Sequence, residues 1–96
     1  MGAFFVANVE VLNAEKFQEY SEKANVTIAA FGGERVIRGF RQQVLTGADT
    51  ANAIGIFRFP NEAAISAWYN SPDYQALIHL REEASNMSIA SYSTPD

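Results

Sequence analysis

The chain of 96 residues contains no cysteine, and its 7 lysine and arginine residues are outnumbered by 11 aspartate and glutamate residues. Without cysteine the chain has no disulfide, no thiolate nucleophile and no cysteine-ligated metal. A formal net charge of −4 argues against nucleic acid, whose affinity for proteins comes mostly from lysine and arginine side chains that neutralise phosphates. We therefore expect no thiol chemistry and no nucleic-acid partner.

Long apolar runs are also missing. The apolar stretch that begins at Phe4 is too short and too alternating for a signal peptide or a transmembrane segment, and no basic residues precede it. We expect no membrane partner and a cytoplasmic location.

Several catalytic motifs are absent as well. The sequence has no nucleophile elbow, no P-loop and no paired acids of the glycosidase type, so hydrolysis and phosphoryl transfer have no support. With a single histidine, only carboxylates remain as metal ligands, and the adjacent Glu82 and Glu83 would diverge by roughly 100° on a helix. We predict no metal and no cofactor.

The composition itself is ordinary. Hydrophobic residues make up 48% of the chain and charged residues 19%, which is typical of a soluble globular protein. The chain is long enough for one hydrophobic core, and we expect residues 1–96 to form a single domain. Arginines gather in the central third of the chain, where they would suit a small anion. The simpler interpretation is that these charges protect an edge strand from aggregation.

Segments rich in β-branched and aromatic residues predict four strands, at residues 4–11, 34–46, 53–59 and 87–93. Gly39 predicts a bulge or bend in the second of these, whose arginines and glutamines favour a sheet edge.

Helix signals lie between the strands. Asn13 is a good N-cap for a helix that Gly32 and Gly33 end, and Asn61 caps a second helix over residues 62–70. Ser71 followed by Pro72 predicts another helix start, so this second helical segment is split. After Pro72, one face is predicted to carry Tyr74, Leu77, Ile78 and Arg81.

The order strand, helix, strand, strand, helix pair, strand predicts an α+β fold. Right-handed crossovers give a ferredoxin-like four-stranded antiparallel sheet with helices on one face. Both faces of the first strand carry apolar residues, Phe4 and Val6 on one and Phe5 and Ala7 on the other. Because the helices cover only one face, we predict that a second copy covers the other, in a homodimer.

A family pattern covers nearly the whole chain. Its four segments run from Phe31 to Gly39, from Val44 to Gly47, from Phe59 to Ala64 and from Trp68 to Tyr74, with Arg81 beyond them. In this order and at these separations the chain resembles the uncharacterised domain-of-unknown-function family 1330. The resemblance implies the dimeric α+β barrel superfamily, in which two ferredoxin-like protomers pair through their sheets. The family has no agreed activity.

Three residues are candidates for catalysis. If the face of the first strand that carries Asn8 lies beneath the helices, Asn8 would meet Trp68 across a cleft between sheet and helices. Haem-degrading and antibiotic-biosynthesis monooxygenases of this superfamily use such a cleft. The chain resembles the haem-degrading group in Asn8, in the segment from Trp68 to Ser71, and in His79, which is near the place of the axial histidine. Because His79 falls at the margin of the helix face centred on Ile78, we predict that haem is not bound tightly.

Five residues are candidates for ligand binding: Arg38, Arg58, Tyr69, Tyr74 and Arg81. If the second and third strands pair, the guanidinium groups of Arg38 and Arg58 would lie near each other and together capture a carboxylate.

Each candidate also has a structural interpretation. Trp68 and Tyr74 are the kind of aromatic residues that fill cores, His79 would face solvent, and the arginines would form surface ion pairs.

Three functions are compatible with these residues. The first is a small-molecule-binding cleft whose ligand is a small organic acid. The second is a cofactor-poor monooxygenase or isomerase of the antibiotic-biosynthesis or haem-degrading type. The third is a non-catalytic structural or interaction dimer. The sequence leaves open whether the protein is an enzyme.

Overall fold

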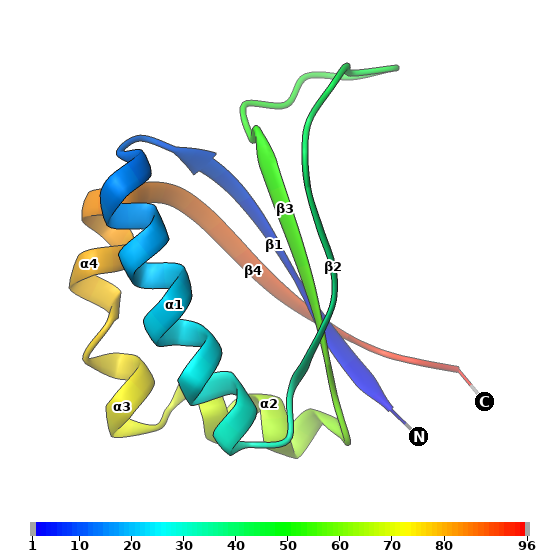
Figure 1. Cartoon of the computed structure of the whole chain (residues 1–96). Coiled ribbons are helices and arrows are strands. Elements are labelled where there is room, and N and C mark those ends of the chain that lie inside the picture. The colour runs from blue at the N-terminus through cyan, green and yellow to red at the C-terminus, as the bar shows by residue number, and fades with distance from the viewer. Residues whose placement is uncertain (1, 96) are drawn as a thin grey trace.

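A computed structural model describes residues 2–95 of the chain. Its elements are β1 (Ala3–Val11), α1 (Ala14–Ala30), β2 (Glu34–Phe40), β3 (Ala53–Phe59), α2 (Glu62–Tyr69), α3 (Pro72–Gln75), α4 (Ile78–Ala84) and β4 (Ser85–Ser93). The strands form one antiparallel sheet in the order β2-β3-β1-β4. All the helices lie on one face of this sheet (Figure 1). The predicted ferredoxin-like α+β fold is confirmed. No helix within residues 2–95 is long and apolar enough to span a membrane.

The helix boundaries follow local capping chemistry. The Asn13 side chain accepts a hydrogen bond from the Lys16 amide at 3.0 Å, and Asn61 accepts from the Ala64 amide at 2.8 Å. Gly32, with φ of 81°, takes the left-handed conformation that ends many helices. These predicted ends are confirmed.

The helix that starts at Ser71 and Pro72 is shorter than expected. The Ser71 hydroxyl accepts from the Tyr74 amide at 3.2 Å, as an N-cap should. The Leu77 amide then donates to the Tyr74 carbonyl at 2.8 Å. This bond spans three residues, so it closes a tight turn that separates α3 from α4.

The prediction for the second strand is wrong in two respects. It ends at Phe40 instead of continuing to residue 46, because β3 begins only at Ala53 and offers no partner beyond it. Residues 41–52 instead form a loop that projects from the body of the protein (Figure 1). The bulge lies at Val36, between Arg35 and Ile37, whereas Gly39 pairs regularly with Ile54.

The two faces of β1 have different environments. Ala3, Phe5, Ala7 and Val9 are buried beneath the helices, whereas Asn8 is exposed on the opposite face. The expectation that Asn8 lies under the helices is therefore wrong.

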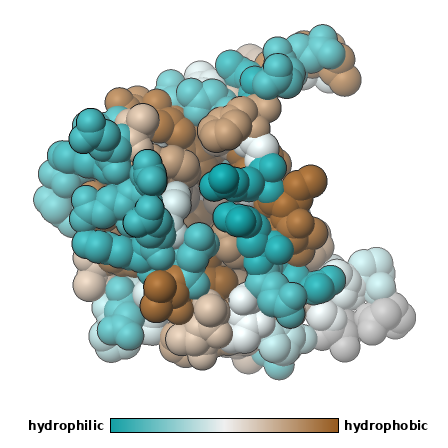
Figure 2. Space-filling view, in the orientation of Figure 1, coloured by the Kyte–Doolittle hydropathy of each residue, from teal (hydrophilic) through white to brown (hydrophobic). Residues whose placement is uncertain are grey.

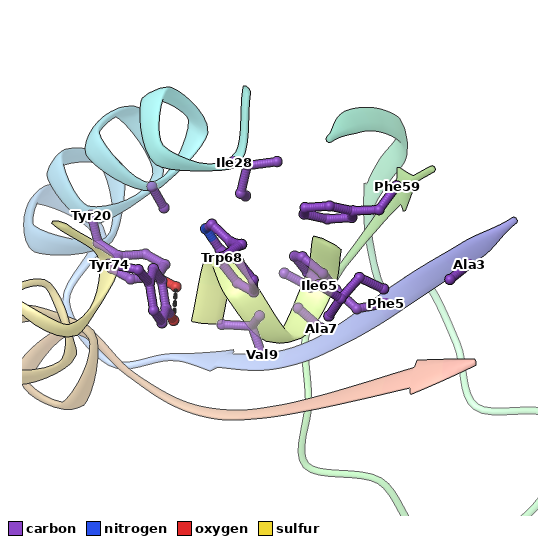
Figure 3. Close-up of a cluster of buried hydrophobic side chains, with 12 residues drawn as sticks. Ala3, Phe5, Ala7, Val9, Tyr20, Ile28, Phe59, Ile65, Trp68 and Tyr74 are labelled. Atoms are coloured by element: carbon purple, nitrogen blue, oxygen red, sulfur yellow. Dashed lines mark hydrogen bonds between the residues drawn. The ribbon is translucent and has the colours of Figure 1, made fainter. Parts of the chain in front are cut away.

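Aromatic side chains fill the core between the sheet and the helices (Figure 3). The rings of Phe5 and Trp68 stack with centroids 4.9 Å apart and planes within 9°. Trp68 is 1% exposed and Tyr74 is 0% exposed, so both act as core residues, in agreement with their structural interpretation. Trp68 is held in place by its indole Nε1, which donates to Thr27 Oγ1 at 3.0 Å.

Candidate functional site

A groove with a volume of about 110 Å³ lies between α1 and the helix-covered face of the sheet. Its floor consists of two adjacent rows of paired residues that cross all the strands from β2 to β4. The first row is Arg38, Gly55, Ala7 and Ile89, and the second is Phe40, Ala53, Val9 and Met87.

Residue size explains why a groove exists at this position. The two central strands contribute Gly55, Ala7 and Ala53 to the floor, and these small residues leave space beneath α1. The neighbouring residues Phe5 and Phe57 stack with centroids 5.0 Å apart and fill the space beside it. The groove thus results from small residues on different strands that the pairing register brings together.

The walls of the groove are mostly apolar, and its polar groups lie on two elements. From α1, Phe17, Tyr20, Ala24 and Ile28 line it together with the polar Ser21 and Asn25; from β2 come Arg35 and Arg38. Figure 2 shows the apolar hollow with hydrophilic residues on either side. Among the described residues, no histidine and no carboxylate lines the groove. An apolar pocket with a few polar groups is the usual form of a small-molecule site.

The β-bulge places both arginines at this groove. Arg35 pairs with Phe57 and Arg38 with Gly55, and both partners face the helices. In a regular strand residues three apart point to opposite faces. The extra residue, Val36, restores Arg38 to the same face as Arg35. Neither arginine forms an ion pair with a carboxylate of the described residues.

A hydrogen-bonded chain of side chains begins at the groove and leads away from it. The hydroxyl oxygens of Tyr20 and Tyr74 are 2.8 Å apart (Figure 3). Arg81 Nη1 donates to the Tyr74 hydroxyl at 3.0 Å and to the Tyr69 hydroxyl at 3.3 Å. Burial, together with the neighbouring Tyr74 hydroxyl, raises the pKa of Tyr20. Partial burial alone would lower the pKa of Arg81, but its hydrogen bonds to Tyr69 and Tyr74 raise it. Tyr20 is thus neutral and Arg81 charged at neutral pH.

A second cavity, of about 320 Å³, contains the other end of this chain. It is lined by Tyr69 and Arg81 together with polar residues of α2 and β4 such as Glu62 and Ser91. Trp68, Met87 and Ile89 line both this cavity and the groove, so they separate the two. The predicted ligand-binding residues are therefore divided, with Arg38 at the groove and Tyr69 and Arg81 at the second cavity.

The predicted pairing of Arg38 with Arg58 is wrong. Arg58 lies opposite Glu34 in the register, on the sheet face away from the helices, and its guanidinium is 3.9 Å from the Glu34 carboxylate. The bulge at Val36 is the cause, because in a regular pairing Arg38 would share a face with Arg58. On the helix-covered face of β2, the arginine next to Arg38 is Arg35.

The three catalytic candidates do not form a joint cleft. Trp68 lines the groove, but Asn8 lies on the other face of the sheet. The His79 side chain is 89% exposed and lies 3.6 Å from Glu83, one turn further along α4. Tyr74 is buried and does not line either cavity.

Sequence reasoning missed Tyr20 and Arg35 as groove residues. Arg35 belongs to the arginines that gather in the central third of the chain. The only available signal for Arg35 was its place in that group.

Comparison with known proteins supports the fold and leaves the activity open. A family model described as "Domain of unknown function (DUF1330)" matches residues 2–92. No curated protein matches the chain.

Several solved structures share the architecture. A protein of unknown function from Rhodopseudomonas palustris has a TM-score of 0.83 at 16% identity, with 99% of this chain and 83% of that chain covered. A dimeric ferredoxin-like protein of unknown function from Jannaschia sp. CCS1 has a TM-score of 0.76 at 8% identity, with 98% and 100% covered. A cofactor-independent oxygenase from Streptomyces nogalater has a TM-score of 0.73 at 11% identity, with 99% and 94% covered.

Proposed function

The chain belongs to the DUF1330 family of domains of unknown function, and from this premise we propose that it binds a small, mainly apolar carboxylate in the groove between α1 and the sheet. The observation that carries the proposal is the pair Arg35 and Arg38 beside an apolar groove, with no carboxylate partner among the described residues. Two like charges on one strand face repel each other, and an anionic ligand relieves that repulsion. Arginine is also the residue best suited to hold a carboxylate through two parallel hydrogen bonds.

The shape of the floor defines the rest of the ligand. The two rows run across three strand spacings, about 14 Å, and their central residues are Gly55, Ala7, Ala53 and Val9. A flexible chain of methylene groups fits such a floor, because it displaces water from apolar surface without requiring polar partners. The ligand class is therefore a medium-chain carboxylic acid.

Octanoate is a suitable probe for this proposal. In a heteronuclear NMR titration we expect octanoate to shift the amide signals of groove residues such as Ala7 and Gly55. The double variant Arg35→Gln/Arg38→Gln should bind it at least roughly ten-fold more weakly, the effect of losing a charged hydrogen-bond partner.

The control is Arg58→Gln, which removes one arginine charge from the opposite face of the sheet and should bind octanoate like the wild type. Octanol, which has the same chain without the carboxylate, should bind more weakly than octanoate. The proposal is wrong if the double variant keeps the wild-type affinity or if the shifts map outside the groove.

A cofactor-poor monooxygenase or isomerase is the second candidate. It is supported by the fold shared with the cofactor-independent oxygenase and by Tyr20 in the wall of the groove. We rank it lower, because no histidine or carboxylate among the described lining residues is available to take a proton from a substrate. Oxygen uptake with a quinol, above the rate in buffer and lost in the double variant Tyr20→Phe/Tyr74→Phe, would reverse this order.

We also propose that the protein forms a homodimer through the sheet face that no helix covers. This face carries apolar side chains from three strands, Phe4, Val6, Ile54, Ile56 and Tyr92. Ile54 is 38% exposed and Tyr92 is 50% exposed in the single chain, and a structural neighbour of the same architecture is described as dimeric. A second copy is the cover that matches this face in size and polarity.

A further inference from the structure

The Tyr20 hydroxyl has an unusual set of hydrogen-bond partners for a buried group. Its side chain is 6% exposed and lines the groove. Besides the Tyr74 oxygen, the other partner of this hydroxyl among residues 2–95 is Met87 Sδ at 3.9 Å, and thioether sulfur is a weak acceptor. Met87 itself lines the groove.

Arg81 fixes the direction of the hydrogen bonds in this chain. A guanidinium only donates, so the Tyr74 oxygen accepts from Arg81. Tyr74 is fully buried, and among the described residues its hydroxyl hydrogen has one acceptor within reach, the Tyr20 oxygen. Tyr74 therefore donates to Tyr20. The hydroxyl hydrogen of Tyr20 is then left for Met87 Sδ or for a group in the groove.

We propose that Tyr20 donates this hydrogen bond to a carbonyl oxygen of the ligand, so that the bound acid is an oxo acid with its carbonyl at the end remote from the carboxylate. This inference rests on the proposed binding of a carboxylate at Arg35 and Arg38, and adds the chemical class of the other end. A carbonyl oxygen is a stronger acceptor than the Met87 sulfur, and so completes the hydrogen bonding of a buried hydroxyl.

The geometry of the floor separates the two ends. Arg38 and Phe40 occupy the β2 end of the rows, and Ile89 and Met87 occupy the β4 end. Because Tyr20 contacts Met87, it lies toward the β4 end. Between them the floor is formed by the small residues of β1 and β3, which contact the apolar middle of the ligand.

The hydrogen-bonded side chains of Tyr74 and Arg81 keep Tyr20 as a hydrogen-bond donor. Burial raises the pKa of Tyr20, so its proton is retained at neutral pH. The charge of Arg81, transmitted through Tyr74, polarises the Tyr20 hydroxyl, because hydrogen bonds in a chain strengthen one another. In this arrangement Tyr74 and Arg81 are positioning residues, and Tyr20 is the one that contacts the ligand.

The test compares octanoate with its methyl-ketone derivative oxooctanoate, in which the penultimate carbon is a carbonyl. The two probes share the carboxylate, so the ratio of their affinities reports on the ketone end of the ligand and not on the arginines. Wild-type protein should prefer oxooctanoate by roughly three- to ten-fold, the effect of one net hydrogen bond. Tyr20→Phe should abolish or invert this preference, because the ketone is then buried without a donor.

Tyr20→Phe also leaves the buried Tyr74 hydroxyl without its acceptor and is liable to unfold. The double variant Tyr20→Phe/Tyr74→Phe removes both hydroxyls and so leaves no such orphan. It should show the same loss of preference. Tyr92→Phe, on the uncovered sheet face, is the matched control and should keep the wild-type ratio.

The outcomes separate the two proposals. Equal affinities of wild-type protein for the two probes, or a preference that survives in the double variant, would overturn the role of Tyr20 while leaving carboxylate binding intact. If octanoate binding does not depend on Arg35 and Arg38, the proposed function fails, and this inference fails with it.

Discussion

Arg35 and Arg38 point to the same face of the sheet although they are three residues apart in one strand. Alternation would place them on opposite faces, and the single extra residue at Val36 removes this difference. Bulges occur frequently near functional sites, where they redirect a side chain. Here the bulge creates a pair of cations at the mouth of an apolar groove, and the proposed function depends on that pair.

The face to which Arg38 points, and not the length of β2, should therefore determine octanoate binding. Deleting Val36 leaves Arg35 and Arg38 two residues apart, and in a regular strand both would still face the groove, so affinity should be retained. The exchange Ile37→Arg/Arg38→Ile keeps the composition but places that guanidinium opposite Ile56, on the other face of the sheet. We expect its affinity to fall by roughly ten-fold or more, as for the loss of a charge-assisted contact. NMR titration measures both variants, and wild-type affinity in the exchange variant would contradict the role of Arg38.

Gly33 should not tolerate a side chain, for reasons of space and not of backbone conformation. A Cβ at this position would contact the Ile28 side chain and lie 2.7 Å from Phe59 Cζ, and its φ is not positive. Gly33→Ala should lower the free energy of unfolding by about 1–3 kcal/mol, the range for overpacked cores.

Gly39→Ala is the matched control for Gly33→Ala. Its Cβ would have Ile54 Cγ2 as its nearest neighbour at 4.0 Å, so stability should change little. Urea denaturation at a fixed protein concentration compares the two variants. Equal losses in both would contradict the steric explanation.

Thr27 should contribute to the stability of the fold through the one hydrogen bond that it accepts from Trp68. Its hydroxyl accepts from the indole Nε1 at 3.0 Å and donates to the Ala24 carbonyl at 2.7 Å. Thr27→Val keeps the shape but leaves the buried indole N–H unpaired, which costs about 1–3 kcal/mol. Urea unfolding should show this loss. Thr46→Val, in the exposed loop, should be nearly neutral, and a neutral Thr27→Val would mean that the indole finds another acceptor.

The sequence predicted those features that depend on local chemistry. Asn13, Asn61 and Ser71 cap helices because each supplies an oxygen to a nearby amide, and β3 has the predicted bounds. The order of elements then determined the topology, since right-handed crossovers allow few alternatives.

Features that depend on pairing between distant strands were not predictable. Both faces of β1 begin with apolar residues, Phe4 and Val6 against Phe5 and Ala7, so the sequence did not show which face the helices cover. The bulge at Val36 leaves no local signature, because Val36 and Ile37 are both ordinary strand residues. The groove floor requires small residues from β1 and β3 to lie side by side, which only the register decides.

The proposed dimer predicts a specific response to charge. Val6→Glu places a carboxylate in the middle of the uncovered sheet face, between Ile56 and Ala90, where burial of an unpaired charge is costly. Sedimentation should show a monomer for this variant and a dimer for the wild type at micromolar concentration. Val26→Glu, at a position 72% exposed on α1, should remain dimeric. A monomeric wild type would refute the dimer.

The burial of Tyr20 predicts a loss of stability in alkaline solution. Burial raises the pKa of this hydroxyl above its ordinary value of 10.0. Below about pH 10 the tyrosine is protonated in both the folded and the unfolded chain, so its contribution to stability is fully present. Above that pH the unfolded chain releases the proton and the folded protein retains it. Ionisation therefore favours the unfolded state, and the free energy of unfolding should fall progressively as pH rises.

Urea unfolding at a series of pH values between about 8 and about 11 tests this. The double variant Tyr20→Phe/Tyr74→Phe should show a shallower fall than the wild type, because it lacks the buried ionisable hydroxyl. Tyr92→Phe, which removes a hydroxyl on the opposite face of the sheet and leaves Tyr20 and Tyr74 in place, is the control and should keep the wild-type slope. Identical slopes in the wild type and the double variant would show that Tyr20 ionises as readily in the folded protein as in the unfolded chain. The hydroxyl would then not be held as the buried donor on which recognition of a carbonyl depends.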